Sequence, residues 1–191
     1  MANERIVINQ DDSVTVRLRN VRLSFPALFK PRAFDETKEP SFSAVFLMAK
    51  EGDPEKNAVY VNQGIQAVIK AAFKGKHPGR ERVCLKDAAE KGERGVDGYD
   101  DTLYFVSTGN KKKVPIVDRD LTPLVEIDGK PYAGCFVNAT IRLWAQDHKQ
   151  YGKRVNAQLK AIQFFGDGEP FGEPSVDPAE EFEAVGEDEA L

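Results

Sequence analysis

The sequence of 191 residues is poor in the residues that build metal sites and disulfide scaffolds. It has two cysteines, Cys84 and Cys135, and two histidines, His77 and His148. None of them stands in a Cys-x-x-Cys or His-x-x-x-His spacing, so a zinc site would need all four scattered residues. We therefore expect no zinc site and no disulfide, and we expect both cysteines to be small buried apolar residues.

Long apolar segments are also missing. No window approaches 18 consecutive apolar residues, which predicts that the chain has no transmembrane helix. The start, Met-Ala-Asn-Glu-Arg, has no apolar core of a signal peptide. These two absences predict a protein that is not secreted, has no membrane partner and stays in the cytoplasm.

Motifs for catalysis are nearly absent. The sequence contains no Gly-x-x-x-x-Gly-Lys-Ser/Thr phosphate loop and no Gly-x-Ser-x-Gly nucleophile turn. Asp118 and Asp120 form an Asp-x-Asp, a pair that can hold a divalent cation but that also arises freely in loops. We expect no catalytic residue, no cofactor and no metal. An enzyme that uses this aspartate pair is the last of the alternatives.

The charge that is present is distributed unevenly. The chain has 27 basic and 31 acidic residues, and every basic residue lies between Arg5 and Lys160. Eight of the acids lie in the last 19 residues, so residues 1–172 carry 27 bases against 23 acids. The last 19 residues contain many acids and few apolar residues, so this segment buries too little apolar surface to fold. We predict a folded domain over 1–172 and a disordered acidic tail over 173–191.

The hydrophobic pattern predicts a mainly β fold. Apolar and polar residues alternate from Val14. The alternation shifts by one residue at Asn20, as it does at a β-bulge, and Pro26 is predicted to end the strand. Further strands are predicted over 41–48, 102–107, 133–144 and 155–165, and an amphipathic helix over 54–74 with Asp53 as its N-cap. Several long strands with one helix inserted after the second favour an OB-fold-like, partly open β-barrel. A β-sandwich is the alternative.

Basic and aromatic residues interleave on the outward faces of these strands. A protein that binds single-stranded nucleic acid needs a basic groove for the phosphates and aromatic rings on which bases stack. The stacking candidates are Phe136 and Trp144 on the 133–144 strand and Tyr151 in the loop predicted over 146–154, which also carries Lys153 and Arg154. Phe29 and Phe34 alternate with bases in a proline-rich loop predicted over residues 26–40. The predicted phosphate contacts are Arg17, Arg19, Arg22, Lys30, Arg32, Lys111, Lys112, Lys113, Arg142, Lys153, Arg154 and Lys160.

Each of these residues also has a plainer interpretation. A lone tryptophan is most often a core residue, and three consecutive lysines are usually a solvated loop. The acidic tail can be a solubility element. It can also mimic a phosphate chain and, being tethered, compete for a basic groove at high effective concentration. The tail residues to which we assign this regulatory role and partner docking are Glu180, Glu181, Phe182, Glu183, Glu187, Asp188, Glu189 and Leu191.

Four stretches resemble a known family. They are Asn20–Phe29 (NVRLSFPALF), Phe42–Lys50 (FSAVFLMAK), Tyr132–Ala139 (YAGCFVNA) and Leu159–Pro170 (LKAIQFFGDGEP). In order and spacing they resemble the single-stranded-DNA-binding proteins of tailed phages, an OB-fold family with acidic C-terminal tails. Tails of this type often end in an aromatic residue, whereas this sequence ends in Leu191.

The resemblance implies a phage protein that coats single-stranded DNA with little sequence preference in DNA replication, recombination and repair. It also implies that the tail limits DNA binding and contacts replication proteins such as a DNA polymerase. A homodimer is a further expectation. Two alternatives remain: an RNA-binding OB module, which would contact the 2′-hydroxyl, and an interaction protein that acts mainly through its acidic tail.

Overall fold

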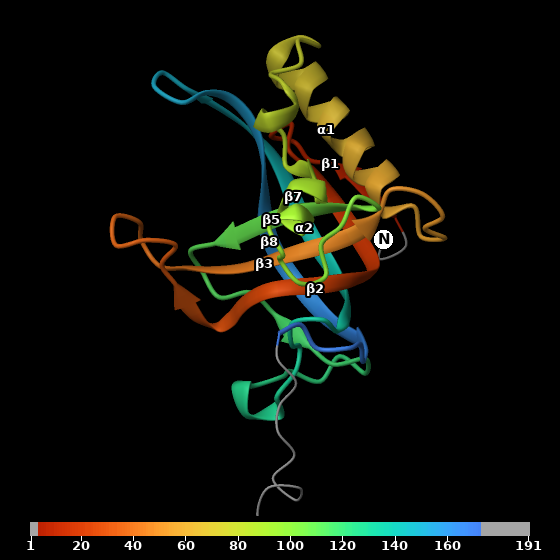
Figure 1. Cartoon of the computed structure of the whole chain (residues 1–191). Coiled ribbons are helices and arrows are strands. Elements are labelled where there is room, and N and C mark those ends of the chain that lie inside the picture. The colour runs from red at the N-terminus through yellow and green to blue at the C-terminus, as the bar shows by residue number, and fades with distance from the viewer. Residues whose placement is uncertain (1–3, 173–191) are drawn as a thin grey trace, which may run out of the picture.

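The computed structural model describes residues 4–172 and shows a mainly β protein (Figure 1). The strands are β1 (Ile6–Ile8), β2 (Val14–Arg32), β3 (Ser41–Ala49), β4 (Leu85–Asp87), β5 (Leu103–Asn110), β6 (Ile116–Val117), β7 (Phe136–His148) and β8 (Gly152–Gly166). The helices are α1 (Asn57–Phe73) and α2 (Ala89–Glu93), with 3₁₀ turns η1 (Arg80–Arg82) and η2 (Glu126–Asp128).

Five strands close into a barrel. Strand β2 pairs antiparallel with β3 and β7, β3 pairs with β5, and β7 pairs with β8. A short parallel contact between β5 and β8, at Gly109 and Gln158, completes the ring. A five-stranded barrel of this kind is the OB-fold architecture. The predicted fold class is therefore confirmed, and the β-sandwich is excluded.

Strand β2 shifts register against both β7 and β3. The shift against β7 is the predicted one, whereas the first shift against β3 lies where the strand is predicted to end. The register against β7 shifts between Leu18 and Val21, which confirms the predicted bulge at Asn20. The predicted end at Pro26 is wrong, because the strand continues to Arg32. Pro26 lies within a second register shift, where φ at Phe25 is +44° and an amide N–H is not needed for the ladder.

Helix α1 begins three residues later than predicted. Its N-cap is Lys56, in the left-handed conformation, so the prediction of Asp53 as the N-cap is wrong. Asp53 still contacts the start of the helix, because its carboxylate accepts the amide N–H of Asn57 at 2.9 Å. The apolar face, with Val61, Ile65 and Val68, is fully buried against the barrel. This burial holds the helix across one end of the barrel (Figure 1).

Gly64 sets how closely α1 approaches the barrel. A Cβ atom at this position would lie 2.8 Å from Leu143 Cδ1 and 3.0 Å from Val16 Cγ2. For Gly64→Ala, overpacking costs about 1–3 kcal/mol and exceeds the gain in helix propensity of about 1 kcal/mol. We expect this variant to lower the melting temperature, measured by thermal denaturation. The exposed Gln66→Ala is the control, and an equal or higher stability of Gly64→Ala would contradict the close packing.

Both cysteines are buried and free, as expected from the sequence. Burial raises the pKa of Cys84 to about 12 and that of Cys135 to about 11. Thiols with such pKa values are protonated near neutral pH and act as apolar packing groups. Among the described residues, no helix is long and apolar enough to cross a membrane.

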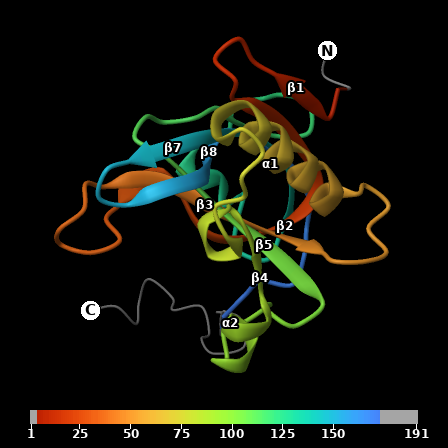
Figure 2. The same cartoon turned by 90° about the horizontal axis from the view of Figure 1, so that it is seen from above.

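Two hairpins extend from the same side of the barrel. We call residues 28–43, where β2 turns into β3, the first arm, and residues 142–158, where β7 turns into β8, the second arm. Both arms extend to the left in Figures 1 and 2, which view the molecule from directions 90° apart. In OB folds, nucleic acid binds across the second and third strands of the barrel. It also contacts the loop between the first and second strands and the loop between the fourth and fifth strands. Here these are β3, β5 and the tips of the two arms.

Candidate functional site

A groove of about 790 Å³ lies on the outer wall of the barrel between β5 and the second arm. Its floor includes Val83 and Val155, which form an isolated parallel bridge. The residues that line it include five bases and no acid. The five bases are Arg82, Lys86, Lys111, Arg142 and Arg154. A concave surface with one sign of charge concentrates counter-ions, so this groove is suited to an anionic ligand.

Arg154 is the most informative of these residues. It is half-buried in the groove, and within residues 4–172 its guanidinium has no carboxylate or hydrogen-bond acceptor as a partner. The half-buried Lys86 lies near it and donates a hydrogen bond to the carbonyl of Glu81. Burial lowers the pKa of Lys86, and repulsion from Arg154 lowers it further. Glu81 acts on Lys86 in the opposite direction, but no acid lines the groove itself. Two like charges held together in this groove form a site that an anion would stabilise.

Trp144 provides an aromatic surface in the same groove. It stands opposite Asn156 in the β7–β8 register and is half-buried. Within the described residues its indole forms no hydrogen bond and no contact with another aromatic ring. Phe105 lines the opposite wall but is buried against Tyr99, with ring centroids 5.6 Å apart. Trp144 is therefore the ring in the groove on which a base can stack.

Arg142 is the one groove arginine that an acidic residue neutralises. Its Nε donates to Ser13 Oγ at 2.9 Å, and its Nη2 donates to the carboxylate of Asp11. Hydrogen bonds from the Ser13 hydroxyl and from Arg142 lower the pKa of Asp11 to about 2. The contribution of the ionised carboxylate to stability is thus present above its ordinary pKa of 3.8 and is lost as the pH falls towards 2. Near neutral pH, the ionised carboxylate of Asp11 therefore binds Arg142, which is one of the predicted phosphate contacts.

Replacing Asp11 by asparagine is expected to strengthen binding of an anionic polymer. The variant keeps the shape of the turn and frees Arg142, so we expect about twofold to fivefold tighter binding at low salt, in keeping with the small energy of exposed ion pairs. Fluorescence anisotropy with labelled oligo-dT measures the change. The control is Asp12→Asn, which removes the same charge from the neighbouring residue. An equal gain in both variants would show that net charge, rather than the freed Arg142, is responsible.

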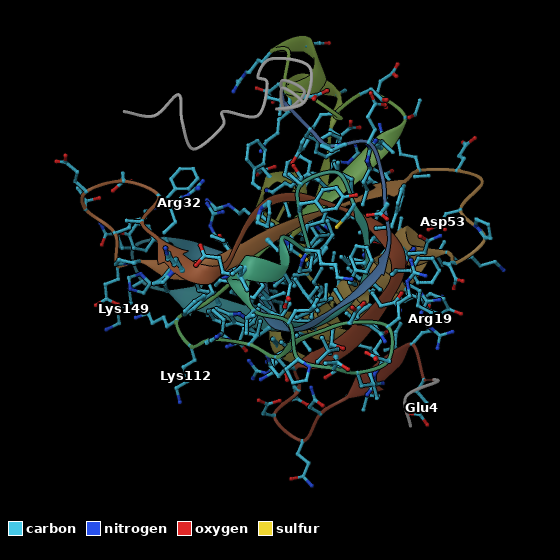
Figure 3. The ribbon with its side chains drawn as sticks, turned by 90° about the horizontal axis from the view of Figure 1, so that it is seen from below. Glu4, Arg19, Arg32, Asp53, Lys112 and Lys149 are labelled. Carbon is cyan, nitrogen blue, oxygen red and sulfur yellow. The ribbon has the colours of Figure 1, made fainter. Side chains whose placement is uncertain are left out.

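The arm tips carry several of the predicted contacts. Tyr151 is 57% exposed at the tip of the second arm, and its ring centroid lies 4.9 Å from that of His148. Lys111 forms an ion pair with Glu39 of the first arm at 2.9 Å. Lys112 and Lys113 are exposed beside it. Figure 3 shows Arg32, Lys112 and Lys149 on one side of the molecule, with Arg19 on the other.

The structure places three predicted arginines away from the groove. Arg17 and Arg19 border a separate cavity of about 250 Å³ together with Asn138 and Gln163. Arg17 also donates to the carbonyl of Glu4 at 2.7 Å. Arg22 donates to the carbonyls of Gly134 at 3.0 Å and Glu169 at 2.7 Å, and its guanidinium lies 4.3 Å from the Phe171 ring centroid. Arg22 therefore holds the segment after β8 against the barrel.

Phe136 and Trp144 share the outward face of β7, as predicted, but they do not form one surface. Eight residues of strand separate them by about 26 Å. Phe136 lies beside the segment after β8, because a Cβ at Gly168 would meet its ring at 3.0 Å. Lys30, on the first arm, forms an ion pair with Glu126 at 3.5 Å.

The expectation that Lys153 and Arg154 lie in a loop is wrong. The hairpin leaves only residues 149–151 outside the strands, so both residues belong to β8. Neighbouring strand residues point to opposite faces. Arg154 accordingly enters the groove, whereas the Lys153 ammonium lies 5.4 Å from the Phe73 ring of α1. Lys160 is exposed at a register shift between β7 and β8 and does not line the groove.

Sequence reasoning missed Arg82 and Lys86. Both lie in the charged segment 76–101, and no local sequence pattern separates them from the other charged residues there. The pairing of β4 with β5 and the bridge from Val83 to Val155 bring them to the groove. Arg82 also donates to the carbonyl of Tyr151 at 2.9 Å, which links it to the tip of the second arm.

The aspartate pair weighed as a cation site is engaged in local contacts. Asp118 forms an ion pair with Lys130 at 2.9 Å, and Asp120 accepts the amide N–H of Thr122 at 3.0 Å. Over residues 4–172 there is no group of three or more His, Cys, Asp or Glu side chains that could hold a metal ion. The tail residues from Glu180 to Leu191 lie outside the described residues.

Comparison with known proteins identifies the family. The family model described as Enterobacter phage Enc34, ssDNA-binding protein, matches residues 14–191. The chain belongs to this family. Its relative "putative protein p50" of Acyrthosiphon pisum secondary endosymbiont phage 1 is 35% identical over 187 residues, covering 92% of this chain and 97% of that protein. The suspected resemblance is therefore confirmed.

Solved structures support the same assignment. The single-stranded DNA-binding protein from bacteriophage Enc34, solved in complex with ssDNA, matches with a TM-score of 0.71 and 26% identity over 88% of this chain and 94% of that chain. The single-stranded DNA-binding protein gp2.5 of bacteriophage T7 shares the fold, with a TM-score of 0.51 and 14% identity over 90% of this chain and 96% of that chain. Single-stranded DNA-binding proteins are a non-enzymatic kind of protein.

Proposed function

We propose that this protein binds single-stranded DNA in the groove between β5 and the second arm, with little sequence preference and without a chemical step. The observation that carries the proposal is the half-buried Arg154, which has no partner within residues 4–172 and lies beside Lys86 and Trp144 in a groove without acids. Membership in the family and the likeness to a protein solved with ssDNA support the same ligand.

In this proposal the groove supplies both parts of a single-strand site. Arg154 and Lys86 bind a phosphate on one wall, with Arg82 and Lys111 at the two ends. Trp144 stacks a base, and Tyr151 at the arm tip offers a second ring. Contacts to phosphates and to the faces of bases carry no sequence information, so the affinity depends strongly on salt and little on sequence.

Membership in the family supports a proposal for the biological role. We propose that the protein coats single-stranded DNA during phage DNA replication, recombination and repair in the cytoplasm of the host cell. The acidic tail over 173–191 competes with DNA for the groove and docks a replication protein such as a DNA polymerase. The mildly basic body and the acidic end of the sequence support this competition by their opposite charges. A homodimer is part of the same proposal.

The test is a titration of labelled oligo-dT with the full chain at low and moderate salt, followed by fluorescence anisotropy. We expect saturable binding with a steep salt slope. Competition with unlabelled oligo-dT and oligo-rU decides between DNA and RNA. Stronger competition by the RNA would favour the RNA-binding alternative, and no binding of either polymer at low salt would favour a protein that acts through its tail alone.

Neutralising the tail in the full chain is expected to tighten DNA binding. In this variant the eight acids after Gly172 become glutamine or asparagine, which keeps the length of the chain. Loss of a tethered competitor lowers the apparent Kd by about tenfold at low salt and by less at high salt, because salt screens the contacts of the tail. Unchanged affinity at low salt would reduce the tail to a docking or solubility element.

A further inference from the structure

A second cleft of about 790 Å³ adjoins the groove. It lies between α1, α2 and the edge strand β4, on the far side of β4 from the second arm. The two cavities share Val83, Lys86 and Phe105 in their linings. Lys86 and Phe105 stand directly opposite each other in the β4–β5 register, so their side chains form one ridge between the two hollows.

The second cleft is also basic, though less so than the groove. Lys50 forms an ion pair with Asp87 at 2.7 Å, and Arg94 pairs with Glu90. The lining also contains the acid Glu81 and the bases Arg80 and Lys91. The charge of Arg80 acts on the Asp87 carboxylate. Within residues 4–172 no hydrogen bond or ion pair engages the side chain of Arg80 or Lys91. The Lys91 ammonium lies 4.6 Å from the Phe105 ring centroid, so a positive charge stands at the ridge on this side too.

The cleft offers apolar surface beside these charges. Val59 projects from the first turn of α1 with 51% of its surface exposed. Tyr104 is half-buried, and the Lys50 ammonium lies 5.3 Å from its ring centroid. Apolar surface, an aromatic ring and cations that form no ion pair together suit a nucleotide.

We propose that one DNA strand occupies both cavities and crosses the ridge formed by Lys86 and Phe105. This inference rests on the proposed function and extends it. The groove with Arg154 and Trp144 holds one part of the strand, Lys86 binds a phosphate at the crossing, and Arg80 and Lys91 bind the continuation beside α1. The occupied length is then set by both cavities together.

The test measures affinity for a series of oligo-dT lengths, from about 4 to about 16 nucleotides, the range that OB folds occupy. The protein is the full chain at low salt. The main variant is Val59→Glu, which places a negative charge in the second cleft. It also places an acid in the first turn of α1, where it favours the helix, so the fold is preserved. The second variant is Arg80→Gln, and the control for charge is Lys70→Gln on the exposed face of α1.

For the wild type we expect affinity to rise with length until both cavities are filled. Val59→Glu should reach its plateau at a shorter length and bind the longest oligomer about tenfold more weakly than the wild type. Arg80→Gln should weaken binding of the longest oligomer about threefold and flatten its salt slope by about one unit. Lys70→Gln should change neither quantity.

An unchanged plateau length in Val59→Glu, with binding of the longest oligomer as tight as in the wild type, would overturn the continued path. Failure of the proposed function has a different signature, which Arg154→Gln reveals. If the groove binds DNA, this variant weakens binding at every length and leaves the plateau length unchanged. If Arg154→Gln has no effect at any length, the groove itself is not the DNA site.

Discussion

Replacing Arg154 by glutamate is expected to weaken oligo-dT binding about a hundredfold at low salt. The variant removes the one groove arginine that has no partner within the described residues and places a carboxylate beside the phosphate path. Loss of one partner of a partly desolvated charge pair costs about 2–5 kcal/mol, and about 2.7 kcal/mol corresponds to a hundredfold change. A fluorescence-anisotropy titration with labelled oligo-dT measures the loss.

The neighbouring residue provides a matched control. Lys153→Glu makes the same change of charge one residue earlier in β8, where the side chain faces α1 rather than the groove. We expect this control to lose at most about fivefold, through long-range repulsion alone. Equal losses in the two variants would show that the net charge of the second arm, and not the groove, determines binding.

Replacing Trp144 by alanine is expected to give the second large effect. Stacking of one base on an aromatic ring is worth about 1–3 kcal/mol, so the affinity should fall by about fivefold to a hundredfold. The salt slope should stay as in the wild type, because no charge is removed. Trp144→Phe should recover much of the loss, since it restores an aromatic face.

Phe136→Ala serves as the comparison for this variant. Phe136 lies on the same face of β7 but beside Gly168 and Arg22, so its loss should lower the melting temperature and leave DNA affinity nearly unchanged. A larger loss of affinity from Phe136→Ala than from Trp144→Ala would place the DNA on the other end of β7.

Much of the fold could be predicted because the strands are long and their patterns are regular. The alternation from Val14 and its slip at Asn20 predicted a bent strand, and the structure has both. Pro26 misled the prediction because a proline usually ends a strand, whereas here it lies in a bulge where no hydrogen bond is needed. That bulge lets β2 reach Arg32 and build the first arm.

The groove was predictable only in part, because it depends on contacts between distant segments. Arg142 and Trp144 have a local signal, since they alternate with buried residues on β7. Arg154 was predicted only as a basic residue in a loop, and the structure places it in β8. Arg82 and Lys86 have no local signal, and only the pairing of β4 with β5 brings them to the site. Conversely, Arg22 has the same alternating signal as the groove residues, yet it binds backbone carbonyls of the segment after β8.

The chain has a single tryptophan, and it lies in the proposed DNA site. Its fluorescence therefore reports on occupation of the groove without a label on the protein. The decisive measurement is a titration of the wild-type chain with oligo-dT that follows tryptophan emission and, in parallel, the anisotropy of a labelled oligomer. We predict that stacking quenches Trp144 with the same apparent Kd as the anisotropy change. Tight binding by anisotropy with unchanged tryptophan emission would contradict the account.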